Sequence, residues 1–252
     1  MNNCIVVIPT YNEKENISSI VKAVFELALP LDVLVVDDNS PDGTADIVKN
    51  LQLEFKQLPK ALGRELHLLQ RQEKSGLGTA YIAGFKYALS LNYKYIFEMD
   101  ADFSHNPDDL IKLYQACENE GYDVAIGSRY VSGVNVVNWP IGRVLMSYFA
   151  SVYVRFITGL PVQDTTAGFI CYRDTVLRNI DLDNIRFIGY AFQIEMKFLS
   201  WKYGFKLKEV PIIFTDRTQG TSKMSKNIFK EAILGVIQIK MRSFFQKYHR
   251  QQ

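Results

Sequence analysis

Short apolar runs that are typical of buried strands alternate with helical patterns through the first half of this chain. Most of these runs are rich in β-branched residues and stop at a proline or a group of turn-forming residues. Strands that alternate with helices build a mostly parallel sheet with helices on both faces. The sequence therefore predicts an α/β fold, with strands at Cys4–Ile8, Val33–Val36, Leu66–Leu69, Tyr95–Met99 and Val124–Ile126.

Polar segments follow three of these strands. Pro9–Glu13 follows the first strand, Asp37–Asp38 the second and Asp100–Asp102 the fourth. Ligands of open α/β sheets bind beyond the carboxyl ends of the strands, so we expect these three segments to converge on one site.

Asp100 and Asp102 are spaced so that both carboxylates point to the same side while strand geometry lasts. Carboxylates are hard oxygen ligands, and Mg²⁺ or Mn²⁺ needs few of them when substrate phosphates supply the other ligands. The alternative is an ordinary aspartate-rich turn. Ser104 adds another oxygen donor, and Pro107 plausibly starts a helix whose N-terminus favours anions. These neighbours favour the metal site.

The segment around Asp37 and Asp38 also looks like the acidic start of a phosphoreceiver domain. That interpretation requires a phosphorylatable aspartate at the third strand, but the next strand-end acid is Asp100, too far along the chain. It also leaves Pro9–Glu13 unexplained. We therefore reject it.

The second half of the chain has a less regular pattern, with helices expected near 143–158 and 190–203, a turn and strand at Asp164–Tyr172, and strand-like residues at 207–214. We expect a single catalytic domain over residues 1–226 and a largely apolar helix in 227–252. Residues 217–252 contain eight Lys or Arg and one acidic residue. A helix that is apolar on most sides must be buried, either against the protein or a second subunit or in a lipid interface.

Charge and cysteine content exclude several classes of protein. The net charge is +2, which argues against general nucleic-acid binding. The three cysteines never form a CxxC arrangement, so neither a disulfide framework nor a thiolate zinc site is expected, and a reducing compartment is indicated. We find no basic-then-apolar leader, and no stretch of 18 residues is free of charge. The prediction is a protein that is cytosolic or peripheral to a membrane.

Several motifs together resemble a known family. Pro9–Glu13, Val35–Thr44 and Met99–Asp102 are similar to the signature of family-2 glycosyltransferases with the GT-A fold. Further segments, in order along residues 4–224, resemble the dolichol-phosphate mannosyltransferases, or polyprenyl-phosphate mannose synthases. They are Gly76–Tyr81, Ser104–Pro107, Gly127–Tyr130, Asp164–Phe169, Gly189–Glu195 and Glu209–Pro211, continuing to Asp216–Arg217 and Ser222–Lys223.

The resemblance implies an inverting, metal-dependent enzyme that moves mannose from GDP-mannose to a polyprenyl monophosphate. It implies a peripheral location on the cytoplasmic side of a membrane, held by the apolar helices or by a small membrane-anchoring subunit. Two alternatives stay open. One is a UDP-sugar:undecaprenyl-phosphate glycosyltransferase, for example for glucose; the other is a catalytically silent subunit that binds sugar nucleotides.

The resemblance also implies roles for individual residues. For the metal it implies Asp100, Asp102 and, more weakly, Ser104. For the acceptor phosphate it implies Arg143 and Ser147. The residues expected to be catalytic are Asp102, Arg217 and Lys223. The nucleotide sugar is expected to contact Pro9, Tyr11, Glu13, Val36, Asp38, Asp100, Ala101, Asp102, Arg129, Arg217 and Lys223.

The implied chemistry requires no general base. The second ionisation of a phosphate monoester lies near pH 6, so the acceptor oxygen is already mostly anionic at neutral pH. The metal and the Arg and Lys side chains would stabilise the charge that grows on the leaving GDP. We therefore expect Asp164, where related enzymes place a base, to have an orienting or structural role.

Overall fold

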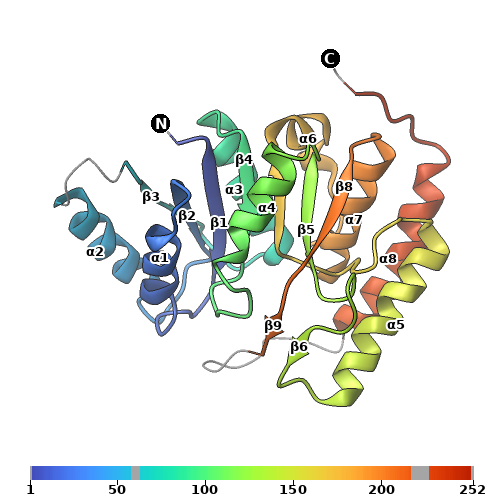
Figure 1. The fold of residues 1–252 in the computed structure, drawn as a ribbon, viewed down its shortest axis with the longest axis horizontal. Helices are drawn as coiled ribbons and strands as arrows, with labels where there is room; N and C mark the ends of the chain where they lie inside the picture. Colours follow the sequence, from blue (N-terminus) through green and yellow to red (C-terminus); the bar gives the residue numbers. More distant parts are fainter. Residues whose placement is uncertain (1, 58–62, 217–226, 251–252) are drawn as a thin grey trace.

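The computed structural model describes residues 2–57, 63–216 and 227–250, and Figure 1 shows its central sheet with helices packed around it. The sheet has seven strands in the order β3-β2-β1-β4-β7-β5-β8, and a second sheet pairs β6 with β9. The strands are β1 (Cys4–Thr10), β2 (Leu31–Asp37), β3 (Leu66–Gln70), β4 (Tyr95–Glu98), β5 (Val124–Ser128), β6 (Val136–Val137), β7 (Ile170–Arg173), β8 (Leu207–Pro211) and β9 (Phe214–Thr215). The helices are α1 (Ile17–Glu26), α2 (Thr44–Gln57), α3 (Leu77–Ser90), α4 (Asp109–Glu118), α5 (Ile141–Thr158), α6 (Asp174–Asn179), α7 (Tyr190–Lys202) and α8 (Asn227–Ser243).

The large sheet is parallel except at one strand, which confirms the predicted mostly parallel α/β fold. β1 pairs with β2 on one side and β4 on the other, both in parallel, so the carboxyl ends of these three strands lie side by side. β7 runs antiparallel between β4 and β5. This strand comes from the second half of the chain and was expected only as part of a turn and strand over 164–172.

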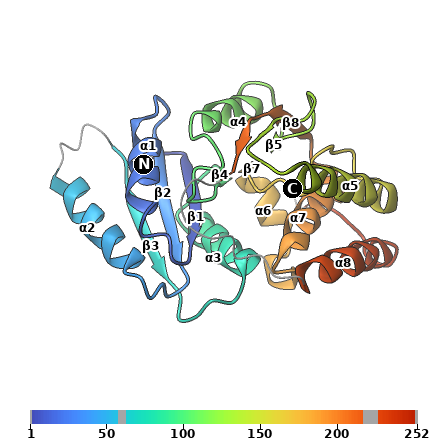
Figure 2. The same ribbon diagram turned by 90° about the horizontal axis from the view of Figure 1, so that it is seen from below.

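Two hydrophobic layers cover the sheet because its central strands bury residues on both faces. Along β1, Val6 and Ile8 face one layer and Ile5 and Val7 the other. The first layer includes α1, α2 and α4, and the second includes α3, α6 and α7. Figure 2 shows α4 and α3 on opposite sides of the strands. Such burial of alternate residues is expected for strands that pack on both faces.

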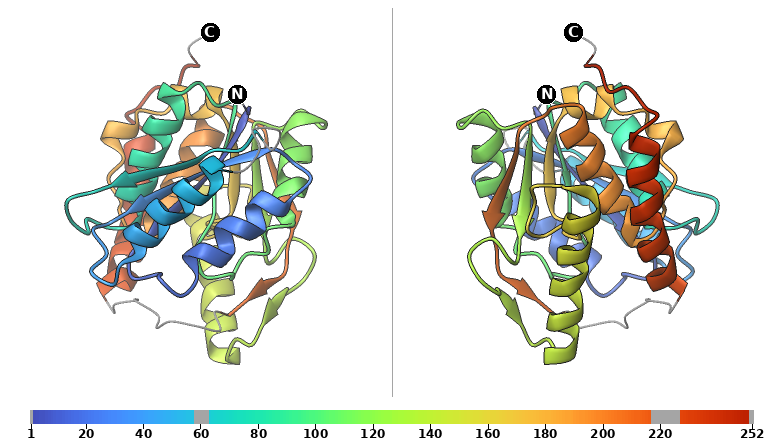
Figure 3. Two further views of the ribbon diagram at one scale, coloured as in Figure 1. Left: turned by 90° about the vertical axis from the view of Figure 1, so that its left-hand side faces the viewer. Right: turned by 90° about the vertical axis from the view of Figure 1, so that its right-hand side faces the viewer.

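α5 and α8 run side by side beyond the β8 end of the sheet (Figures 1 and 3). Val236 and Ile239 of α8 are buried against Val154 of α5 and residues of α7. Leu234, on another side of α8, is 60% exposed. Protein packing therefore buries only part of the apolar surface of α8. Within the described residues, no helix combines the length and the hydropathy needed to cross a membrane.

Candidate active site

The predicted acidic pair lies in a loop, residues 99–106, that leaves β4 at the carboxyl edge of the sheet; we call it the acidic loop. Asp102 is buried, with Oδ1 accepting a hydrogen bond from the Ser104 amide at 3.0 Å, whereas the Asp100 side chain is 41% exposed. Phe103, between Asp102 and Ser104, has a positive φ of 59°, which is rare for a bulky residue. Strained backbone of this kind often occurs at functional sites.

Within the acidic loop, the side chain of His105 points into the protein and anchors the loop. Its ring is buried and stacks on Phe169 with 4.8 Å between ring centroids. Its Nδ1 accepts from the Asp100 amide at 3.5 Å. Burial lowers the pKa of His105 to about 4, so the imidazole is neutral at physiological pH. The imidazole thus supports the loop without adding positive charge.

The ends of β1 and β2 lie next to the acidic loop, as predicted from strand topology. Asp37 is fully buried and accepts hydrogen bonds from Thr10 Oγ1 at 2.9 Å and Ser40 Oγ at 2.6 Å, so it fastens the two strand ends together. Asp38, the residue expected to contact the nucleotide, forms an ion pair with Arg71 at 2.8 Å. Burial raises the pKa of Asp38, and Arg71 opposes that rise.

The other residues expected at the nucleotide differ in accessibility. Pro9, near the end of β1, and Tyr11 and Glu13, which follow the strand, are partly exposed. Val36 is fully buried in the core, so none of its atoms is open to a ligand in this structure. Ala101 is 4% exposed and also packs into the core.

Sequence reasoning missed two basic residues at this edge. Arg71 bonds to Asp38 and also donates to Thr79 Oγ1 at 2.7 Å. The Lys74 Nζ atom lies over the Tyr11 ring, 4.2 Å from its centroid. Both residues follow β3 in sequence. A search for basic as well as acidic residues after each strand would have found them.

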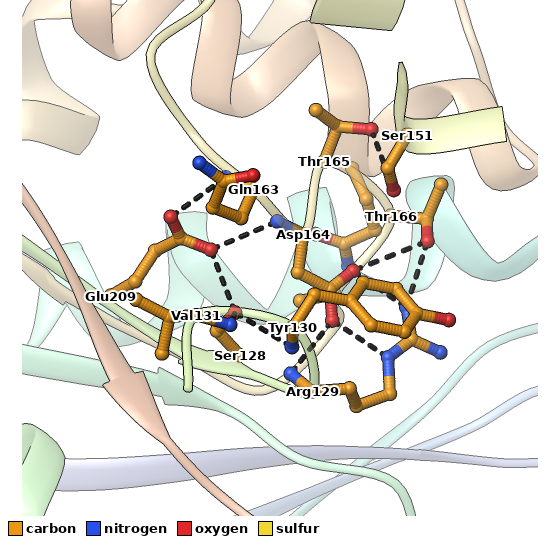
Figure 4. Close-up of polar contacts among 12 residues, drawn as sticks. Ser128, Arg129, Tyr130, Val131, Ser151, Gln163, Asp164, Thr165, Thr166 and Glu209 are labelled. Carbon is orange, nitrogen blue, oxygen red and sulfur yellow. Dashed lines mark hydrogen bonds and ion pairs between the residues drawn. The ribbon is translucent and has the colours of Figure 1, made fainter. Parts of the chain in front are cut away.

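Arg129, expected to contact the nucleotide sugar, forms a buried ion pair with Asp164 at the end of β5 (Figure 4). Its Nε and Nη2 donate to the two oxygens of Asp164 at 2.7 and 2.6 Å, and its amide donates to Asp164 Oδ2 at 3.0 Å. Nη2 also donates to Thr166 Oγ1 at 2.8 Å. Burial alone would raise the pKa of Asp164, but the charge and hydrogen bonds of Arg129 hold it below its usual value. An aspartate held in this way is suited to orienting Arg129, not to accepting a proton.

The acceptor residues inferred from the resemblance lie on α5, where Ser147 is one helical turn after Arg143 and both are partly exposed. Arg143 Nη1 contacts Asp216 Oδ2 at 2.9 Å. The neighbouring residue of Asp216, Thr215, donates its amide to the Ser104 carbonyl at 3.2 Å. Arg143 and the acidic loop therefore share the carboxyl edge of the sheet, joined through β9. Arg217 and Lys223, the other predicted catalytic residues, lie outside the described residues.

The donor set of the acidic loop fits a metal that a bound diphosphate helps to coordinate. In the part of the chain that the structure describes, no group of three or more His, Cys, Asp or Glu side chains is arranged to hold a metal ion by itself. Two neighbouring carboxylates, one of them exposed, are enough for Mg²⁺ or Mn²⁺ when phosphate oxygens complete the shell. The Ser104 side chain remains only a predicted ligand.

Comparison with known proteins agrees with this fold and site. The chain belongs to glycosyl transferase family 2, since the model of that family matches residues 5–181. It has the GT-A fold. It is 44% identical over 232 residues to the polyprenol monophosphomannose synthase of Mycolicibacterium smegmatis, covering 92% of this chain and 84% of that one. It is also 44% identical over 230 residues to the undecaprenyl-phosphate mannosyltransferase of Micrococcus luteus, covering 91% and 90%.

Solved structures share the fold at low sequence identity. One is the mannosyltransferase PcManGT of Pyrobaculum calidifontis in complex with GDP-Man and Mn²⁺, with a TM-score of 0.58 and 15% identity. The match covers 94% of this chain and 69% of that chain. These comparisons identify the chain as a glycosyltransferase enzyme and confirm the predicted family.

Proposed function

We propose that this enzyme transfers mannose from GDP-mannose to a polyprenyl monophosphate. The observation that carries the proposal is the placement of the acidic loop and Arg143 at one edge of the sheet, linked by the Ser104–Thr215 and Arg143–Asp216 contacts. One anionic substrate needs the carboxylates with a cation, and the other needs the guanidinium. The names of the two 44% identical relatives support mannose as the sugar and polyprenyl phosphate as the acceptor.

The donor half of the site would be formed by the ends of β1, β2 and β4. Tyr11, Glu13 and Asp38 would hold the nucleoside, and Asp100 and Asp102 would hold Mg²⁺ or Mn²⁺ at the diphosphate. The metal, when bound, neutralises negative charge on the leaving diphosphate. The GDP-Man and Mn²⁺ complex of PcManGT supports this choice of donor and ion.

The acceptor half would need no proton-abstracting residue. A phosphate monoester is mostly dianionic at neutral pH, and Asp164 is already paired with Arg129. Arg143 and Ser147 would orient the phosphate oxygen towards the sugar. Their role is positioning two anions for a single displacement.

A lipid acceptor also requires contact with a membrane, and α5 and α8 offer exposed apolar side chains for it. Phe149 and Phe156 of α5 are 61% and 85% exposed, and Leu234 of α8 is 60% exposed. Exposed apolar side chains concentrated on neighbouring helices favour an interfacial location. We place the enzyme at the cytoplasmic side of a membrane, with a small anchoring subunit as the competing explanation.

The membrane contact is tested by liposome flotation with anionic vesicles. The double variant Phe149→Ser/Phe156→Ser is expected to lose vesicle binding, because it removes apolar area from α5. Leu53→Ser is the matched control, since Leu53 is 59% exposed on α2, which packs against the opposite end of the sheet. Equal flotation of both variants would show that Phe149 and Phe156 do not make the membrane contact, and absence of flotation for the unchanged protein would favour the anchoring subunit.

The reaction is tested by sugar transfer to a fluorescent polyprenyl phosphate with a panel of donors and Mg²⁺ or Mn²⁺. Transfer from GDP-mannose in preference to UDP-glucose is expected. Preference for a UDP-sugar would replace the mannose assignment with the first alternative. Absence of transfer from every donor would favour the silent subunit.

A further inference from the structure

Trp139 lies between two arginines that the site contains. It stands in the short connection between β6 and α5, four residues before Arg143. The Arg143 guanidinium carbon is 4.0 Å from the centroid of the Trp139 ring, a close cation–π contact. The Arg129 guanidinium carbon is 5.4 Å from the same centroid. One indole therefore contacts both the buried Arg129 and the partly exposed Arg143.

The position of this indole is fixed by the small β6–β9 sheet. Phe214 of β9 contacts the Trp139 ring edge-on at 5.2 Å between centroids, and it also contacts His105 of the acidic loop at 5.3 Å. Phe214 pairs with Val136 in the ladder, and its amide donates to the Asn135 carbonyl at 3.0 Å. Trp139 is thus built into the connection between the acidic loop and Arg143.

The indole N–H of Trp139 lacks an acceptor within the described part of the chain. The Nε1 atom is inaccessible to solvent, and none of the described residues accepts a hydrogen bond from it. A buried donor without a partner is costly and rare in native proteins, so its persistence calls for an explanation. An indole nitrogen can only donate, and the neighbouring guanidinium can only donate as well. A ligand that satisfied both groups would have to offer hydrogen-bond acceptors, and the oxygens of a phosphate are acceptors that also carry the negative charge a guanidinium favours.

We propose that Trp139 is an acceptor-binding residue, whose ring face positions Arg143 and whose N–H, covered in this structure, is uncovered when the acceptor binds and donates to an oxygen of the lipid-borne phosphate. The proposal rests on the proposed function, which assigns the acceptor phosphate to Arg143. The Arg143 guanidinium carbon is only 4.0 Å from the centroid of the Trp139 ring, so a phosphate that binds Arg143 also lies beside the indole. Asp216, bonded to Arg143 Nη1, restricts the guanidinium to one orientation against the ring. Its own amide is held by the Val137 carbonyl at 3.1 Å.

Two substitutions of Trp139 distinguish the contribution of its ring face from that of its N–H. Trp139→Phe keeps an aromatic face and removes the donor, and Trp139→Leu removes both. We expect Trp139→Phe to raise the KM for the polyprenyl phosphate about tenfold, the usual effect of losing a hydrogen bond to a charged group. Trp139→Leu should raise it about thirtyfold or more, because Arg143 also loses its stacking partner. In both variants the KM for GDP-mannose should stay within about twofold, which a general loss of structure would not produce.

The chain offers a direct binding measurement because it contains two tryptophans. Trp201 lies on α7 beside Phe198 and Lys202 and is not part of the site. Trp201→Phe leaves Trp139 as the single indole emitter and should keep wild-type activity. Titration with farnesyl phosphate should shift the emission of Trp201→Phe and leave that of Trp139→Phe unchanged. Farnesol, which lacks the phosphate, should shift neither.

The outcomes separate this inference from the proposed function. If transfer from GDP-mannose occurs but the acceptor KM is unchanged in Trp139→Phe and Trp139→Leu, the inference is wrong and the function stands. If transfer fails but farnesyl phosphate shifts Trp139 emission, the acceptor site stands and the donor assignment is wrong. If Trp139→Leu does not fold, Trp139→Phe and the fluorescence titration decide alone. An unresponsive Trp139 emission overturns the inference.

Discussion

Replacing Asp164 by Asn should cost this protein about 3–5 kcal/mol of unfolding free energy, the usual loss when one partner of a buried ion pair is removed. Both side chains are buried, with Asp164 at 0% and Arg129 at 9% exposure. The substitution leaves the Arg129 guanidinium charged inside the protein with a weaker acceptor. Because Arg129 cannot lose its proton, it cannot escape this cost by becoming neutral.

Urea unfolding followed by circular dichroism measures the loss. Thr166→Val is the matched control, since it keeps both charges and removes only the 2.8 Å bond from Arg129 Nη2 and the long 3.4 Å bond to Asp164 Oδ1; it should cost about 1 kcal/mol. The double variant Arg129→Met/Asp164→Leu should be more stable than Asp164→Asn, because it removes both charges together. If Asp164→Asn loses under about 1 kcal/mol, or if the double variant is the least stable of all, the pair does not act as described.

Acid gives an independent check of the same pair. The pKa of Asp164 is lower in the folded protein than its usual value, so its contribution to stability is present at neutral pH. That contribution is lost as pH falls below about 4, because the folded state must then protonate a carboxylate that the unfolded state protonates more readily. The difference in stability between wild type and Asp164→Asn should therefore shrink below pH 4. A difference that stays constant down to pH 2 would contradict this linkage.

Two further substitutions test the packing and the chemistry. Gly84→Ala should destabilise the folded protein by about 1–3 kcal/mol, because the new Cβ would lie 2.4 Å from Cγ1 of Val7 and push α3 away from β1. In Gly142→Ala the new Cβ meets no atom within 4 Å, so this control should lose no stability. Thermal melts of both variants measure the difference. Asp102→Asn should lower kcat about a hundredfold or more with the fold intact. Asp183→Asn, which changes an exposed carboxylate paired with Lys86, is the control and should keep wild-type turnover. Near-normal rates for Asp102→Asn in metal-replete buffer would count against the role of Asp102 as a metal ligand.

Most of the fold could be predicted because its elements carry their own local signals. Strands such as β1 and β2 are continuous apolar runs, and the turn-forming residues after them mark their ends. The antiparallel β7 and the two-residue strands β6 and β9 were not predicted as such. A two-residue strand has no periodicity, and β7 differs from its neighbours only in direction. Both depend on pairing between residues far apart in the sequence, which local patterns do not encode.

The residues of the candidate site also divide into those that local sequence signals could predict and those that they could not. The meeting of Asp38, Asp100 and Asp102 at one edge could be predicted, because the carboxyl ends of neighbouring parallel strands lie side by side; their roles stay predictions. Trp139 and Asp216 were not found, because their contacts with Arg143 exist only once β9 pairs with β6. An aromatic residue before a helix has no distinguishing signal in a single sequence.

The ion pairs in the structure also determine which basic side chains of the site keep a net positive charge around them. A guanidinium that already holds a carboxylate at 2.6 and 2.7 Å presents little net charge to a third group, so Arg129 adds little to the field at a diphosphate. Arg71 is similarly paired with Asp38. Lys74, beside Tyr11, has a cation–π contact with the ring, which does not cancel its charge. Among the described residues at the donor edge, Lys74 would therefore contribute more than Arg129 to the cationic field at the proposed diphosphate, while the ion pair of Arg129 joins the β5 end to the Asp164 segment.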